Sequence, residues 1–152
     1  NGQVISSSLI RKALDSGEIK QARAMLGYDP MLEGQVIEGE QRGRTIGFPT
    51  ANLAVSSELN VPGNGVYAAH AQIKERIYTA VVNIGTKPTF HEEYPISIEA
   101  HLIDFGDDIY GEKMRLYVID KIRDERRFNN VEELVRQISK DRDRAIQIAS
   151  SQ

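Results

Sequence analysis

A short glycine-rich stretch contains the residues best suited to bind a phosphorylated ligand. Residues 39–52 read Gly-Glu-Gln-Arg-Gly-Arg-Thr-Ile-Gly-Phe-Pro-Thr-Ala-Asn and lie between two predicted strands. Glycines let backbone N–H groups approach an anion, and Arg44 can neutralise phosphate charge. Thr50 and Asn52 share a strand face and offer neutral oxygen atoms that suit Mg²⁺ already carrying phosphate oxygens. The stretch matches neither the P-loop nor the dinucleotide pattern and could be a plain turn, so phosphate binding is a hypothesis.

A second candidate group is the carboxylate of Glu99. The segment Ile96-Ser-Ile-Glu-Ala-His-Leu102 alternates apolar and polar residues, which predicts a strand with Glu99 and His101 on its polar face. A carboxylate fixed on a strand can accept the proton of a hydroxyl group that is being phosphorylated. The alternative is a solvated strand residue paired with a lysine or arginine.

The elements that position these groups are mostly strands. Runs of Val, Ile, Tyr and Thr broken by Gly, Pro, Asn and Asp predict strands near 33–39, 51–55, 65–74, 76–84, 96–104 and 114–122. Short links between them favour an antiparallel barrel or sandwich. Two short helices are expected within residues 6–26. A closing helix should follow the Asn130 cap, with Glu133 at the capping-box position and Val131, Leu134, Val135, Ile138, Ala145 and Ile146 as its apolar residues.

Composition limits the class of protein. The chain has 152 residues, 40% hydrophobic and 27% charged, which suits one compact domain with a short appendage. It has no apolar run long enough for a membrane span, no signal-peptide core and no cysteine. A net charge of −3 argues against broad nucleic-acid binding. We therefore expect a cytoplasmic protein that binds neither membrane nor nucleic acid and is a monomer.

The motifs, in their order along the chain, resemble those of the riboflavin kinase family. The segment Gly43-Arg-Thr-Ile-Gly-Phe-Pro-Thr-Ala-Asn-Leu53 resembles the family signature, with the Pro-Thr-Ala-Asn core intact at Pro49 to Asn52. The later matches are Gly65-Val-Tyr-Ala68, Asn83-Ile-Gly85, Pro88-Thr-Phe90, Glu99-Ala-His101, Asp108-Ile-Tyr-Gly111 and Arg123 to Phe128. The resemblance covers about residues 31–149. It implies a six-stranded antiparallel Greek-key β-barrel with a C-terminal α-helix, in agreement with the strand pattern.

The same resemblance implies roles for individual residues. Gly39, Arg44, Thr50 and Asn52 would contact ATP or ADP, and Thr50 and Asn52 would also hold Mg²⁺. Glu99 would be the catalytic base. A flavin pocket needs an apolar wall and donors for the ring carbonyls, and the segment Arg123-Asp-Glu-Arg-Arg-Phe128 supplies both. Arg123, Arg126 and Phe128 would therefore contact riboflavin or FMN, although the family often has proline at Asp124 and lysine at Arg126. Read without the resemblance, this segment could be a basic turn that caps the last helix.

The first thirty residues carry a separate resemblance. Ile5-Ser-Ser-Ser-Leu-Ile-Arg11 is similar to the closing motif of the adenylyltransferase module in bacterial bifunctional FAD synthetases, with Ser8 in place of threonine. We therefore expect residues 1–30 to be a loosely packed helical remnant or linker and residues 31–152 to be the kinase barrel. The natural covalent partner would be an N-terminal FMN adenylyltransferase module. This chain contains no His-x-x-His nucleotide motif, so it should not form FAD.

Two other functions compete with riboflavin phosphorylation. One is a non-catalytic barrel that holds a flavin, a nucleotide or RNA; the presence of Glu99 beside Thr50 and Asn52 speaks against it, because a binding module needs no base. The other is a kinase for a different polyol or vitamin, against which only the Arg123 to Phe128 segment argues.

Overall fold

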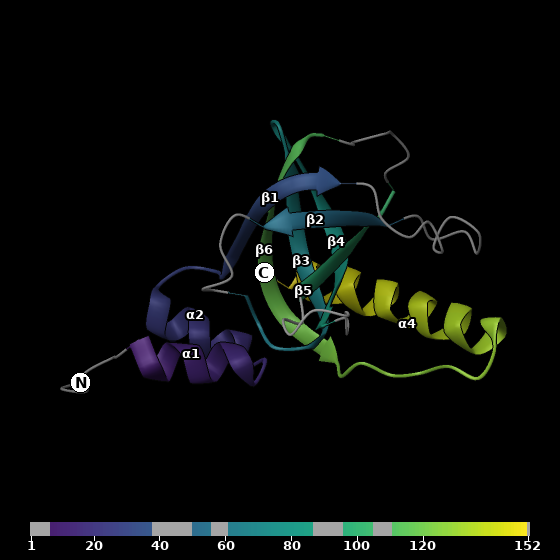
Figure 1. Cartoon of the computed structure of the whole chain (residues 1–152), viewed down its shortest axis with the longest axis horizontal. Coiled ribbons are helices and arrows are strands. Elements are labelled where there is room, and N and C mark those ends of the chain that lie inside the picture. The colour runs from purple at the N-terminus through teal and green to yellow at the C-terminus, as the bar shows by residue number, and fades with distance from the viewer. Residues whose placement is uncertain (1–6, 38–49, 56–60, 87–95, 105–110, 152) are drawn as a thin grey trace, which may run out of the picture.

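Six antiparallel strands close into a barrel in the computed structural model, which describes residues 7–37, 50–55, 61–86, 96–104 and 111–151 (Figure 1). Around the barrel the strands follow the order β1-β2-β5-β4-β3-β6. The consecutive strands β3, β4 and β5 lie side by side and β6 returns beside β3, which is the Greek-key arrangement. The predicted fold is therefore confirmed. The strands are β1 Met31–Ile37, β2 Ala51–Val55, β3 Gly65–Ile73, β4 Arg76–Thr86, β5 Ile96–Leu102 and β6 Lys113–Arg123.

The barrel interior and its outer wall hold separate apolar clusters. Strand alternation sends Leu53, Val82 and Ala100 into the interior, where they pack with Leu116 and other buried residues. On the outer side, Val66 and Ile119 pack in a second cluster with residues of the last helix, α4. Strand β3 is therefore buried on both faces along its first half. The helix covers part of the outer wall and leaves the outer faces of β2 and β5 partly exposed.

Helix α4 spans Val131–Ser150 and begins with the predicted cap. The Asn130 side chain accepts a hydrogen bond of 2.8 Å from the Glu133 N–H, and the Glu133 carboxylate accepts one of 3.3 Å from the Asn129 N–H. The predicted apolar face is only partly right. Ile146 is 42% exposed, whereas Asp141, Ala145 and Ile148 face the barrel. The half of α4 that begins at Val131 extends past the barrel, as Figure 1 shows in yellow-green.

The two predicted N-terminal helices are α1, Ser7–Asp15, and α2, Ile19–Leu26. They are not loosely packed: Leu14 is fully buried, and Ile19 belongs to the same cluster as the barrel interior. The Gly63 N–H donates a 2.8 Å hydrogen bond to the Leu14 carbonyl. This helical pair covers one end of the barrel (Figure 1). Within the described residues, no helix is long and apolar enough to cross a membrane.

Gly63, two residues before β3, lies tightly against the end of α1, so its replacement should destabilise the fold. A Cβ atom at Gly63 would overlap the Asp15 carbonyl oxygen. We expect Gly63→Ala to cost about 1–3 kcal/mol of unfolding free energy, the usual range for overpacking, and to lower the melting temperature by about 3–10 °C. Thermal melts monitored by circular dichroism would measure this, with Asn64→Ala at the next, exposed residue as the control. Equal melting temperatures for wild type and Gly63→Ala would show that the pair is not held at this contact.

Tyr67 gives the same region a dependence on pH. Its fully buried hydroxyl donates a 2.6 Å hydrogen bond to the Gly63 carbonyl, and burial, with a smaller effect of the Asp124 charge, raises the pKa of Tyr67 to about 12. The unfolded chain loses this proton near pH 10, so the phenol's contribution to stability should decline between about pH 10 and 12. We expect the melting-temperature difference between wild type and Tyr67→Phe to narrow over that interval. A constant difference from pH 9 to 12 would contradict the assignment.

Candidate active site

Three polar residues form a row across adjacent strands on the outer wall of the barrel. Asn52 of β2 pairs directly with Glu99 of β5, and Glu99 pairs with Asn83 of β4. Directly paired residues of antiparallel strands project from the same face, with Cβ atoms about 4.5–5.5 Å apart. Their neighbours Ala100 and Val82 point into the core, so the row faces outward. The two residues expected to bind metal and to accept a proton are therefore side by side.

Glu99 lies at the centre of this row and in the middle of β5. The strand has the alternation expected from its sequence: Ile98, Ala100 and Leu102 are buried, while Glu99 and His101 are half-buried on the outer face. Both polar side chains interact with other groups of the protein. The position of Glu99 relative to Asn52 is set by the direct pairing of their strands.

Thr50 and Asn52 offer a hydroxyl and an amide oxygen at the beginning of β2, and both residues are half-buried. Because they are two positions apart, their side chains fall on one side of the extended chain. Among the described residues, no group of three or more histidine, aspartate or glutamate side chains could hold a metal ion by itself. The neutral donor pair fits a hard cation that takes its remaining ligands from phosphate and water. Gly39 and Arg44, the other two expected nucleotide contacts, lie outside the described residues.

The three residues expected on the flavin side come together at the end of β6 and in the segment that follows it. The Phe128 ring is half-buried, and the guanidinium carbons of Arg123 and Arg126 lie 5.7 and 4.8 Å from its centroid. Arg126 also pairs with Glu133 of α4 at 2.6 Å. An aromatic ring beside two cations offers both an apolar surface and donors for carbonyl or phosphate oxygens.

The segment that holds this cluster extends back over the outer face of β4. A Cβ atom added to Gly85 would lie 2.8 Å from a carboxylate oxygen of Glu125. Gly85 pairs with Ser97 of β5, two residues before Glu99. Asn52, with Thr50 two residues before it, thus forms the β2 end of the row, and residues 123–128 lie near its β4 end. Glu99 therefore lies between the residues expected to bind metal and the segment expected to contact the flavin.

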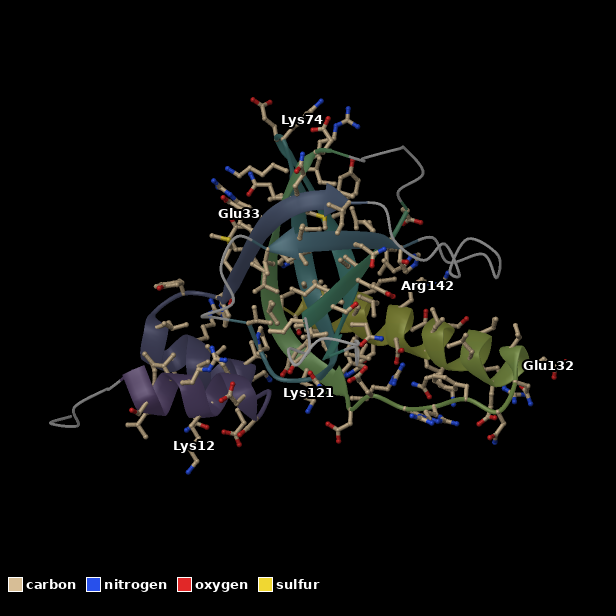
Figure 2. All side chains as sticks on the ribbon, in the orientation of Figure 1. Lys12, Glu33, Lys74, Lys121, Glu132 and Arg142 are labelled. Atoms are coloured by element: carbon tan, nitrogen blue, oxygen red, sulfur yellow. The ribbon has the colours of Figure 1, made fainter. Side chains whose placement is uncertain are left out.

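The wall formed by β1 and β6 differs from this site. There Glu33 pairs with Lys113 at 3.1 Å and with Arg115, and Figure 2 shows Glu33 on the side of the barrel away from α4. Hydrogen bonds from Arg115 and Lys113 hold the pKa of Glu33 below its usual range. These charges are satisfied by one another, so they do not form a second candidate site.

Comparison with known protein families shows which family the chain belongs to. The family model described as riboflavin kinase matches residues 26–149. The chain belongs to the riboflavin kinase family. It is 46% identical over 149 residues to the bifunctional riboflavin kinase/FMN adenylyltransferase of Bacillus subtilis, a match that covers 97% of this chain and 47% of that protein. The chain therefore spans about half the length of the curated relatives it matches.

Two solved structures have the same fold. One, titled a macrolide-efflux protein from Streptococcus pneumoniae, matches with a TM-score of 0.87 and 39% identity over 91% of this chain and 45% of that one. The other is a riboflavin kinase from Trypanosoma brucei, with a TM-score of 0.59 and 25% identity over 79% of each chain. The riboflavin kinase family thus accounts for most of the chain, including every described element from β1 to α4.

Sequence reasoning did not single out two features of this riboflavin kinase fold. Asn83 was included in a family motif but was assigned no role from the sequence. Its position beside Glu99 results from the pairing of β4 with β5. Three acceptors on α4 contact Arg123 or Arg126. Their spacing of four residues was the available sign that they share a face: Glu133, Gln137 and Asp141.

Proposed function

We propose that this chain transfers the γ-phosphoryl group of ATP to the 5′-hydroxyl of riboflavin, giving FMN and ADP. The observation that carries the proposal is the direct pairing of Asn52 with Glu99 on the outer barrel wall of a riboflavin kinase family member. It brings a metal-type oxygen donor next to a carboxylate able to act as a base.

Glu99 would accept the proton of the riboflavin hydroxyl as that oxygen bonds to the γ-phosphorus. The bond between the γ-phosphorus and the β,γ-bridging oxygen breaks, and ADP leaves. Transition states of this kind are loose, so alignment of the two substrates contributes more than the base does. Fixing Glu99 in a strand between two paired neighbours serves that alignment.

Thr50 and Asn52 would hold Mg²⁺, and Gly39 and Arg44 would contact the nucleotide beside them. When bound, Mg²⁺ neutralises phosphate charge and orients the γ-phosphoryl group. On the acceptor side, Phe128 would contact the flavin ring while Arg123 and Arg126 supply N–H donors to its oxygen atoms.

FMN, and not FAD, is the product proposed for this chain, because its sequence contains no His-x-x-His nucleotide motif. The named relatives are bifunctional and about twice as long, so we propose that an adenylyltransferase module is the natural partner of this half. Residues 1–30 would connect the two modules. We propose no role for nucleic acid.

Riboflavin-dependent release of ADP tests the proposed substrate class. We expect ADP release with riboflavin, ATP and Mg²⁺, and none when ribitol or pyridoxal replaces riboflavin. Riboflavin binding without ADP release would instead support a non-catalytic flavin-binding barrel. Comparable release with several unrelated alcohols would indicate a kinase of a different or broader specificity.

A further inference from the structure

Asp141 is the one charged residue that is buried in the described part of the chain, with 2% of its surface exposed. Its carboxylate accepts from Arg123 Nε at 3.0 and 3.1 Å and from Arg123 Nη2 at 2.8 Å. Gln137, one turn earlier on α4, donates a further 2.9 Å hydrogen bond. Both carboxylate oxygens thus accept from the Arg123 guanidinium group, and one of them also accepts from Gln137.

The pair is not explained by stability alone. Burying an ion pair costs desolvation free energy, and well-packed apolar residues of similar volume often stabilise a fold equally well. Asp141 instead lies at the end of a row of acceptors on α4. Glu133 and Gln137 bind Arg126 at 2.6 and 3.1 Å, and Asp141 binds Arg123. Each acceptor holds an arginine that also lies against the Phe128 ring.

The contacts also leave Arg123 able to bind a ligand. A guanidinium group has five N–H donors. Asp141 takes two of them and the Asp124 carbonyl takes a third at 3.0 Å, which leaves two (5 − 3) without a partner among the described residues. About a fifth of the side chain, 21%, is exposed. Asp141 therefore orients a cation whose remaining donors are available.

We propose that Asp141 is a positioning residue for the flavin side of the site. Through Arg123, and through Gln137 to Arg126, it holds residues 123–128 against α4 in the conformation that receives riboflavin. This inference rests on the proposed kinase function. It assigns Asp141 an effect on riboflavin and none on ATP. The proposed nucleotide residues are Asn52 of β2 and Thr50 just before that strand, on the other side of Glu99.

Steady-state kinetics of Asp141→Asn, with riboflavin and ATP varied separately, test this role. We expect the KM for riboflavin to rise about 10- to 100-fold, as for other misplaced binding groups, while the KM for ATP changes less than twofold. Asp143→Asn is the matched control, because it makes the same change at an exposed position of the same helix. Gln137→Leu removes the hydrogen-bonded link without leaving a buried charge unpaired, and should raise the riboflavin KM several-fold in a folded protein.

The outcomes separate the inference from the proposed function. A wild-type chain that forms no FMN would contradict the function itself. An active wild type whose Asp141→Asn and Gln137→Leu variants show equal changes in both KM values, or only a lower melting temperature, would overturn the positioning role. A double-mutant cycle adds a further requirement: the effects of Asp141→Asn and Arg123→Gln on the riboflavin KM must be strongly non-additive.

Discussion

Glu99→Gln is expected to lower kcat by about 100- to 10,000-fold, the usual contribution of a positioned general base. Glutamine keeps the size of the side chain and its hydrogen-bonding capacity but cannot accept the hydroxyl proton. ATP binding should persist, because the expected nucleotide and metal contacts come from β2 and the residues before it. Steady-state kinetics would give kcat, and calorimetric titration with a non-hydrolysable ATP analogue would give the affinity.

The control for this substitution is Glu75→Gln, which makes the same chemical change in the exposed turn between β3 and β4. It should leave kcat and ATP affinity unchanged. If Glu99→Gln retained kcat within threefold of wild type, another group would have to accept the proton. If it lost ATP binding to the same extent as turnover, Glu99 would be acting in nucleotide binding and not as the base.

Asn52→Ala should have the second large effect, on metal-dependent ATP affinity. The substitution removes the amide oxygen proposed to bind Mg²⁺ and leaves the β2 backbone pairing intact. Loss of a residue that only orients a metal ligand lowers metal affinity about 10- to 100-fold. Loss of a direct ligand should therefore lower the Mg²⁺-dependent affinity for ATP by at least that factor. Titration of ATP with and without Mg²⁺ would measure it, and only the affinity with Mg²⁺ should fall.

Asn64→Ala provides the matched substitution at an exposed asparagine. It should leave both affinities unchanged. An equal loss of ATP affinity with and without Mg²⁺ in Asn52→Ala would mean that Asn52 contacts the nucleotide and does not hold the metal. No change in either condition would remove Asn52 from the site.

Local sequence pattern predicted the strands and the face on which Glu99 lies. Alternation in Ile96 to Leu102 is a property of neighbouring residues, so it could be recognised without the tertiary structure. Boundaries shifted by a few residues, as in β1, which begins at Met31 and not at the predicted Glu33. The pairing of Asn52 with Glu99 could not be read in this way, because β2 and β5 are distant in the sequence and meet only when the barrel closes.

Contacts made by helices were the least predictable part. Asp141 stands in the polar run Ser139-Lys-Asp-Arg-Asp-Arg144, which by itself suggests a solvated helix face. Its burial depends on where Arg123 emerges from β6, which is tertiary information. The same holds for Ile19: the sequence marks a short helix, but only the assembled barrel shows that this side chain joins the core.

The central claim is tested most directly by the identity of the product. The chain would be incubated with riboflavin, ATP and Mg²⁺, and riboflavin, FMN and FAD would be separated by chromatography, with Glu99→Gln as the control. We predict FMN without FAD from the wild type and little or no FMN from the variant. Absence of FMN from a folded wild-type chain that still binds riboflavin or ADP would contradict the account and would make the barrel a binding module.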